Sequence, residues 1–147
     1  MQIGDICSRE VYIVRPDEPL AVAVREMNNR HIGAVIVVES RGEAIRPVGI
    51  ATDRDVVNGQ IDRSADLFCL TVGDVMTKHP LTLLETSDVT EGIERLRARG
   101  VRRAPVVNEV GDLVGIVTFD DLLPVLAEEL TALARLVGTQ ASRESSP

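Results

Sequence analysis

The chain repeats itself, and this internal repeat constrains the fold more than any other feature of the sequence. Residues 4–8 (Gly-Asp-Ile-Cys-Ser) recur as residues 73–77 (Gly-Asp-Val-Met-Thr), at an offset of 69. A second match, at an offset of 66, relates residues 48–55 to residues 114–121. The difference of three residues falls in the turn-like segments 40–47 and 109–112, where insertions and deletions are tolerated. The 147 residues therefore hold two similar halves that share one architecture.

Each half predicts the order strand, helix, strand, strand, helix, from its apolar periodicity and its turn residues. In the first half these elements are residues 11–14, 19–30, 34–38, 49–51 and a helix from about Asp53. In the second half they are residues 81–84, 87–99, 105–107, 115–117 and a helix from about Phe119. Thr86 or Ser87 is the expected N-cap of the helix over 87–99, and Gly100 is its expected stop. The predicted fold class is α/β (α+β).

Composition excludes several classes of partner. The hydrophobic share of 44% is enough to bury a core, but the only aromatic residues are Tyr12, Phe68 and Phe119. Because the net charge is −7 and exposed rings for base stacking are scarce, we expect no nucleic acid partner. No signal peptide or membrane-length apolar run is visible, which predicts a cytoplasmic protein with no membrane partner. The two cysteines lie 62 residues apart without a CxxC motif, so no disulfide framework or zinc site is expected.

The most specific local motif is Thr-x-x-Asp between a strand and a helix, and it occurs in both halves. The pairs are Thr52 with Asp55 and Thr118 with Asp121. Such a pair can be a helix N-cap only, because Thr accepts an amide hydrogen bond and Asp complements the helix dipole. The same groups can also bind a ribose, since a carboxylate accepts hydrogen bonds from vicinal hydroxyls beside a helix N-terminus that favours anions. The two interpretations are compatible.

No constellation of catalytic residues is visible. His31 and His79 are not equivalent under the repeat, and we expect both to be surface residues. No HExxH, GxSxG or P-loop motif occurs, and a nucleotide hydrolase is disfavoured because no base stands out. The carboxylates of 53/55 and 120/121 have no apparent third oxygen ligand, so no metal site is expected. The sequence favours a protein that is not an enzyme.

At these residues the chain resembles a known family. Residues 49–55 and 115–121, with the strands in 32–38 and 101–107, look like two cystathionine-β-synthase (CBS) domains in tandem, called a Bateman module. The resemblance covers residues 4 to about 126 and implies two pseudo-twofold-related β-α-β-β-α repeats packed sheet to sheet. The expected divisions are CBS repeat 1 (1–62), a linker (63–72), CBS repeat 2 (73–126), a C-terminal helix extension (127–140) and a disordered tail (141–147).

The resemblance implies a regulatory sensor that binds AMP, ADP, ATP or S-adenosylmethionine in clefts between the repeats. No cofactor is required, although Mg²⁺ could accompany a nucleotide. The expected partners are an adenosine-containing small molecule, a second copy in a homodimer and an effector protein that the sequence does not identify. The alternative is a dimerising protein-interaction module with degenerate, unoccupied clefts.

The family's site residues carry over to two clefts. The second cleft would use Thr118 and Asp121 for ribose and Arg102 and Arg103 for phosphate, with Pro80, Leu81 and Ala104 around the base and Ser8 closing it. The first would use Thr52 and Asp55, with Val11, Ala34 and Val35 as lining and Thr77 and Lys78 closing it. Because the first half has Gly33-Ala34 in place of the arginine pair, Arg54 is its substitute cation.

Two ambiguities remain at the sequence level. Arg102 and Arg103 can anchor a phosphate against the repulsion of Asp120, or they can be a solvated strand end. We favour the second cleft for a nucleotide, with the first empty or taking a less charged adenosine compound. The apolar stripe of the last helix can serve a dimer or pack on its own core; it consists of Leu126, Leu130, Leu133 and Val137.

Overall fold

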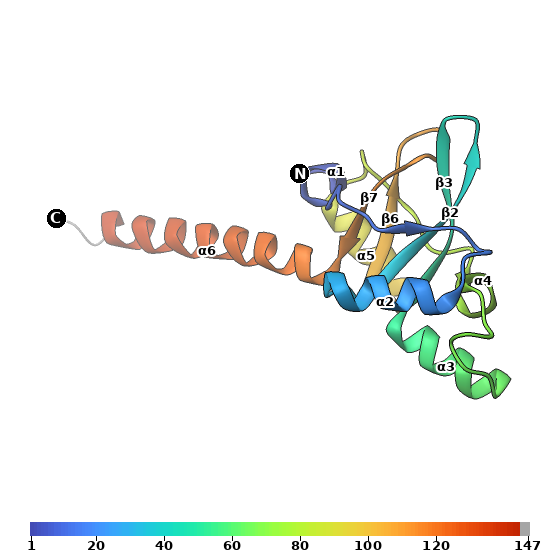
Figure 1. Ribbon diagram of the computed structural model, residues 1–147. Helices are drawn as coiled ribbons and strands as arrows, with labels where there is room; N and C mark the ends of the chain where they lie inside the picture. The colour runs from blue at the N-terminus through green and yellow to red at the C-terminus, as the bar shows by residue number, and fades with distance from the viewer. Residues whose placement is uncertain (145–147) are drawn as a thin grey trace.

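The first half of the chain folds in the expected order, with one short helix added in front (Figure 1). The computed structural model describes residues 1–144. The elements of the first half are α1 (Ile3–Ile6), β1 (Ile13–Val14), α2 (Leu20–Arg30), β2 (Ala34–Arg41), β3 (Ala44–Thr52) and α3 (Asp53–Arg63). The strands are longer than predicted at the β2–β3 hairpin, because the register continues to Arg41 and Ala44 at the turn.

The second half repeats this order. Its elements are α4 (Val72–Val75), β4 (Thr77–Lys78), β5 (Leu83–Leu84), α5 (Val89–Arg99), β6 (Arg103–Val107), β7 (Leu113–Thr118) and α6 (Phe119–Glu144). In each half the first long strand pairs parallel with the short strand before the helix and antiparallel with the strand after it. The mixed α/β fold of two related repeats is therefore confirmed.

The two halves exchange their opening segments. Strand β4 belongs to the second half but completes the first sheet, where Thr77 pairs with Ile50 and Lys78 with Gly49. The equivalent Ser8 forms an antiparallel bridge to Ile116 of β7 in the other sheet. Each sheet is thus finished by residues from the opposite repeat.

The short helices take part in the same exchange. In α1, the Ile3 amide donates to the Ser87 carbonyl at 2.8 Å, and the Ile3 side chain is fully buried in the second core. In α4, the Val72 amide donates to the Glu18 carbonyl at 3.0 Å, and Val72 is fully buried in the first core. Because each core contains a residue from the other repeat, neither repeat can complete its packing alone.

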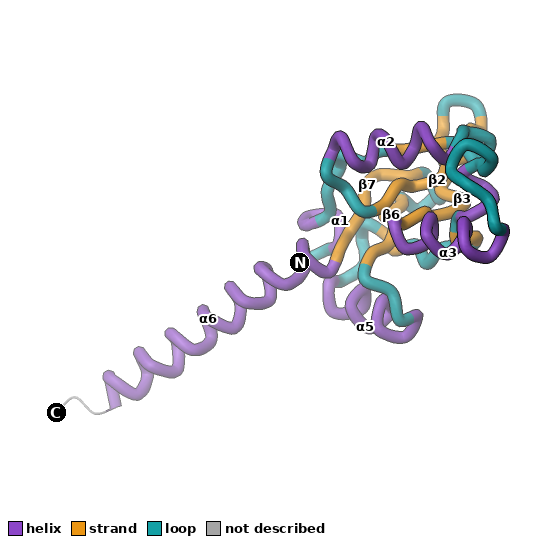
Figure 2. The backbone as a smooth tube through the Cα atoms, turned by 60° about the horizontal axis from the view of Figure 1, so that its bottom comes forward, coloured by secondary structure: helices purple, strands orange, loops and turns teal. Residues whose placement is uncertain are grey.

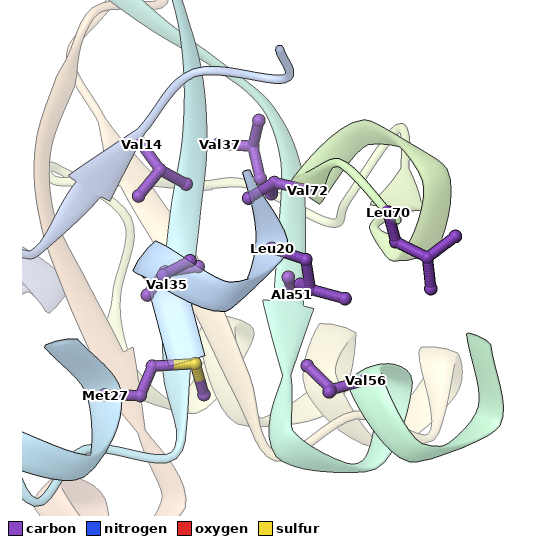
Figure 3. Close-up of a cluster of buried hydrophobic side chains, with 10 residues drawn as sticks. Val14, Leu20, Met27, Val35, Val37, Ala51, Val56, Leu70 and Val72 are labelled. Atoms are coloured by element: carbon purple, nitrogen blue, oxygen red, sulfur yellow. The ribbon is translucent and has the colours of Figure 1, made fainter. Parts of the chain in front are cut away.

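Three apolar clusters form the core. Figure 3 shows the first, in which Leu20 and Met27 of α2 and Val56 of α3 meet Val35 and Val37 of β2. The second cluster lies between the second sheet and its helices. The third joins the two sheets face to face, so the sheet-to-sheet packing is confirmed; its buried members are Ile36, Val38 and Ile50, packed against Leu113 and Ile116 of β7 among others.

The ends of the helices agree with the sequence in part. Helix α2 ends at His31, which takes the left-handed conformation (φ 55°), and α5 ends at Gly100 (φ 64°) as expected. The expected N-cap of α5 was wrong. Asp88 caps this helix instead, because its carboxylate accepts a hydrogen bond from the Thr90 amide at 3.1 Å.

Helix α6 is longer than expected and projects from the body of the protein (Figures 1 and 2). It continues from the second repeat through the extension to Glu144, so a disordered tail from residue 141 is wrong for residues 141–144. Residues 145–147 of that expected tail lie outside the described part of the chain. Despite its 26 residues, neither α6 nor any other helix within residues 1–144 is long and apolar enough to cross a membrane.

Candidate functional site

Both Thr-x-x-Asp corners are complete capping boxes at the start of a helix. At α3, the Asp55 amide donates to Thr52 Oγ1 at 3.2 Å, and the Thr52 amide donates to Asp55 Oδ2 at 3.0 Å. At α6, the matching bonds between Thr118 and Asp121 are 3.3 and 3.1 Å. The N-cap role of the motif is therefore confirmed in both halves.

The caps leave part of each carboxylate available. All hydrogen bonds to Asp55 and Asp121 go to Oδ2, so Oδ1 of each has no partner among residues 1–144. Both side chains are half-buried, at the N-terminus of a helix. A half-buried carboxylate oxygen in this position can accept hydrogen bonds from ligand hydroxyls.

The two threonine hydroxyls differ. Thr118 Oγ1 donates to Asp121 Oδ2 at 3.0 Å, so its proton is already used. Thr52 Oγ1 accepts a hydrogen bond from the Asp55 amide but donates none within the described residues. The second corner therefore has one more hydrogen bond between its Thr and its Asp than the first corner has.

Strand alternation separates the expected lining residues into two groups. Val11 and Ala34 pack in the cluster between the sheets. Val35 and Ala104 are buried in the clusters that face the helices. Because neighbouring residues of a strand point to opposite faces, the side chains of the second group lie away from the space between the sheets.

The same alternation separates the two arginines. Arg102 stacks over the Phe119 ring, with its guanidinium carbon 5.3 Å from the ring centroid. Arg103 pairs with Thr118 across β6 and β7, yet its guanidinium extends to the first corner. A Cβ built on Gly33 would lie 3.5 Å from Arg103 Nη1 and 3.7 Å from Asp53 Oδ2. The structure therefore does not bring the two guanidinium groups together.

The position of Arg103 reveals two residues that the sequence argument missed. Gly33 leaves room for the guanidinium because it carries no side chain, and Asp53 contributes a carboxylate nearby. Applying strand alternation to Ala34 and its repeat equivalent Arg103 would have indicated that this arginine faces the other half.

The remaining expected site residues are spread over the molecule. Ser8 and Thr77 lie on the exchanged edge segments, and Arg54 is exposed in the first turn of α3. Lys78 and Pro80 line a surface hollow of about 540 Å³ with Val48 of β3 and Met76, among others. Leu81 is buried in the second helix-facing core.

A pair of hollows between helices follows the repeat position by position. The first, about 640 Å³, lies between α2 and α3, and the second, about 320 Å³, lies between α5 and α6. At offsets of 69 and 66, Met27 corresponds to Leu96, Asp53 to Phe119, and Gln60 to Leu126. These hollows were not predicted from the sequence, although the repeat offsets pair the residues that line them.

The described residues contain no group of three or more His, Cys, Asp or Glu side chains placed to hold a metal ion. His31 and His79 are both exposed, as expected. Burial is the main cause that raises the pKa of the half-buried Cys7 thiol, which makes this thiol a weaker nucleophile at neutral pH.

Comparison with known proteins identifies the repeated unit. The family model of the CBS domain matches residues 3–62 and again residues 72–128. A protein of Methanopyrus kandleri is 30% identical over 125 residues, which are 85% of this chain and 62% of that protein. A 17.7 kDa protein of Acidianus ambivalens is 32% identical over 127 residues, 86% of this chain and 74% of its own length.

An enzyme is also among the relatives. Inosine-5′-monophosphate dehydrogenase of Thermoplasma acidophilum is 33% identical over 118 residues, but these cover only 22% of the enzyme and 80% of this chain. The chain thus spans less than two thirds of the length of some of the relatives that it matches. The similarity concerns the paired repeats and not the remaining part of that enzyme.

Solved structures share the fold. A CBS domain protein of Thermoplasma acidophilum superposes with a TM-score of 0.76 at 27% identity, covering 84% of this chain and 68% of that one. A CBS domain protein of Pyrobaculum aerophilum complexed with AMP gives 0.74 at 22% identity, covering 87% and 99%. A CBS domain pair in complex with 5′-methylthioadenosine and S-adenosyl-L-methionine gives 0.75 at 21% identity, covering 88% and 98%.

Proposed function

The chain belongs to the CBS-domain family as a tandem pair of these domains, and from this premise we propose that it is a non-catalytic sensor of an adenosine-containing ligand. AMP, ADP, ATP and S-adenosylmethionine are the ligands to be compared. The solved neighbours support this choice of ligand, since one is complexed with AMP and another with 5′-methylthioadenosine and S-adenosyl-L-methionine.

The observation that carries the proposal is the Oδ1 atom of Asp121. The capping box holds this carboxylate through Oδ2, while Oδ1 has no partner among the described residues. The carboxylate is fixed in orientation before the ligand arrives, which lowers the entropic cost of binding. In our proposal Oδ1 accepts the ribose hydroxyls, and the Thr118 hydroxyl can turn from Asp121 to the ligand.

Arg103 is the proposed phosphate ligand. It starts beside Thr118 on the paired strand and extends toward Gly33, so a nucleotide with its ribose at Asp121 would direct its phosphate toward the first corner. Asp53 lies at the same place and repels additional negative charge. We therefore expect AMP or S-adenosylmethionine to bind more tightly than ATP.

Calorimetric titration of the purified chain with AMP tests the ribose site. Asp121→Asn keeps an oxygen for the cap but removes the charge, and we expect AMP to bind at least about tenfold more weakly, as for the loss of a charge-assisted hydrogen bond. Asp74→Asn is the matched control, because Asp74 closes the same kind of capping box with Thr71 at the start of α4. Equal AMP affinity in the two variants would show that Asp121 is only a cap.

A sensor must also respond to its ligand. A bound nucleotide shifts the protein only by its differential affinity for two states, so we propose a partner whose affinity depends on occupancy. The cytoplasm as location and an effector protein as partner belong to this proposal. A ligand that binds the folded state raises Tm, which makes thermal unfolding with AMP, ATP and S-adenosylmethionine the first screen.

The second candidate function is an interaction module with unoccupied clefts. The exposed apolar side chains of α6 favour it, because such a surface marks an interaction site in a folded protein. The same screen separates the candidates. No change in Tm with any of the three ligands would support the interaction module and would overturn the sensor.

A further inference from the structure

Helix α6 leaves the body of the protein soon after it begins. Of its residues only Leu122 is buried, and the helix then extends away from both sheets (Figures 1 and 2). Of the two alternatives for its apolar stripe, packing on the protein's own core is therefore wrong for the residues beyond Leu126. Leu130, Leu133 and Val137 are 69, 60 and 66% exposed.

Six of the seven large exposed apolar residues of α6 repeat every 3.5 residues, and the seventh, Leu136, lies outside this repeat. The spacing alternates between four and three residues from Phe119 to Val137, without interruption over three turns beyond the body. This is the a/d pattern of a coiled coil, in which one narrow seam faces a partner helix. The seam consists of Phe119, Leu123, Leu126, Leu130, Leu133 and Val137.

A single projecting helix does not explain this seam. A helix in a folded protein gains most of its stability from packing its apolar face, and most apolar side chains of α6 have no such packing within the chain. Within one chain, Phe119, Leu123 and Leu126 line the hollow between α5 and α6, whereas Leu130, Leu133 and Val137 line neither hollow, and α6 projects from the body beyond it. A partner helix would bury the seam and stabilise α6.

The spacing of the seam makes it complementary to itself. Leu126, Leu130, Leu133 and Val137 are separated by four, three and four residues, so the pattern reads the same in both directions. Two antiparallel copies can therefore place Leu130 against the second copy's Leu133 and Leu126 against the second copy's Val137. An interface in which the same patch serves both subunits is the normal arrangement of a C2 dimer.

The charges of α6 favour the antiparallel direction. Residues 119–131 carry four acidic side chains and no basic one, whereas residues 132–144 carry two arginines and one glutamate. Antiparallel pairing sets the acidic half of one helix against the basic half of the other, and it also opposes the helix dipoles favourably. Parallel pairing would set the two acidic halves side by side.

We propose that two copies of this chain dimerise through the α6 seam as an antiparallel helix pair, with their bodies at opposite ends. The pairing leaves the candidate ligand site accessible. Asp121 lies two residues after Phe119 and two before Leu123, on the face of α6 opposite the seam. The dimer therefore does not depend on ligand binding at the corner, and either proposal can fail without the other.

Sedimentation equilibrium of the full chain tests the dimer. We expect the wild type to be dimeric at micromolar concentration and Leu130→Ser/Leu133→Ser to dissociate at least about 100-fold more readily, because each copy loses two buried apolar contacts. Ala132→Ser/Thr139→Ser is the matched control, since it introduces two serines on the opposite face of the helix and removes none of the charges. A monomeric wild type, or a seam variant as dimeric as the control, would overturn the proposal.

Spin-label distances test the direction. Thr131→Cys and Thr139→Cys are exposed label sites, used in a background with Cys7→Ala and Cys69→Ser. In the antiparallel pair the two labels at 139 lie about 20 Å farther apart along the axis than the two labels at 131, at 1.5 Å rise per residue. Equal distances at the two sites would mean a parallel pair and would contradict the proposed arrangement.

Discussion

The hollow between α2 and α3 and the hollow between α5 and α6 occupy equivalent places in the two repeats, but their surfaces differ in chemistry. Where the first presents Asp53 and Gln60, the second presents Phe119 and Leu126. The buried residues behind them, Val56 and Leu122, are apolar in both. Core positions have kept their apolar character because packing demands it, whereas the exposed positions have diverged. The apolar hollow is the one that continues into the seam of α6.

The two Thr-x-x-Asp corners also differ, in the hydroxyl that is free to donate and in the charge that the neighbouring strand provides. The first corner has the free threonine hydroxyl, but its own strand offers Ala34 where the second offers Arg103. The Arg103 guanidinium then reaches across to Gly33 of the first corner. The two corners are therefore not equivalent, because the Arg103 guanidinium of the second repeat lies at the corner of the first.

The largest effects are expected in the cores of the two repeats. Leu122→Ala removes a 3% exposed side chain from the second core and should lower the free energy of unfolding by about 3 kcal/mol. Val56→Ala at the equivalent place should cost about 2 kcal/mol, because it removes fewer buried carbons. Urea unfolding at one fixed protein concentration measures both, with the variant Ile61→Ala as control, because Ile61 is 69% exposed. Equal losses for positions 56 and 122 would contradict this comparison.

The next largest losses of stability are expected where the exchanged segments pack against Gly115 and Gly49. A Cβ on Gly115 would meet the backbone oxygen of Ser8 at 2.6 Å, so Gly115→Ala should destabilise the protein by about 2 kcal/mol. On the equivalent Gly49 the nearest atom is Met76 Sδ at 2.6 Å, in a flexible side chain that can move, so we expect about 1 kcal/mol. The same urea titrations give both values. A larger effect at Gly49 would mean that the edge formed by β4 is the more rigid one.

The smallest effect concerns the two neighbouring arginines. If Arg103 binds the phosphate, Arg103→Ala should weaken AMP binding about tenfold, which corresponds to 1.4 kcal/mol. Arg102→Ala should change it less than about twofold, because its guanidinium stacks on Phe119 instead. Calorimetric titration compares the variants. The reverse order would place the phosphate on the outer side of the second corner.

The sequence was sufficient for the order of elements and for the two corners. The repeat offsets and the apolar periods depend on local patterns, and α2, α5 and both capping boxes lie where those patterns indicate. The cap of α5 was misassigned by one or two residues, since Thr86, Ser87 and Asp88 can all accept the same kind of hydrogen bond. Local sequence patterns show that a helix begins in this region, but they do not show which of several neighbouring residues is its N-cap.

The candidate site was predictable only in part. The type of residue at each position could be read, but the direction of a side chain could not be assigned without the sheet. Val35 and Ala104 were expected beside a ligand and are buried toward the helices, and the two adjacent arginines point to different places. A shift of one residue along a strand reverses the face, so an approximate strand position is not enough.

By itself the sequence determined that the protein is a doubled unit with a Thr-x-x-Asp corner in each half, because repeats, periods and caps are properties of neighbouring residues. Only the tertiary structure decided which half each group serves. In that structure Ile3 and Val72 are buried in the cores of the opposite repeats, and the Arg103 guanidinium lies at the corner of the first repeat. The seam of α6 is exposed. These outcomes depend on contacts between residues far apart in the chain, and such contacts are fixed by how the two sheets pack.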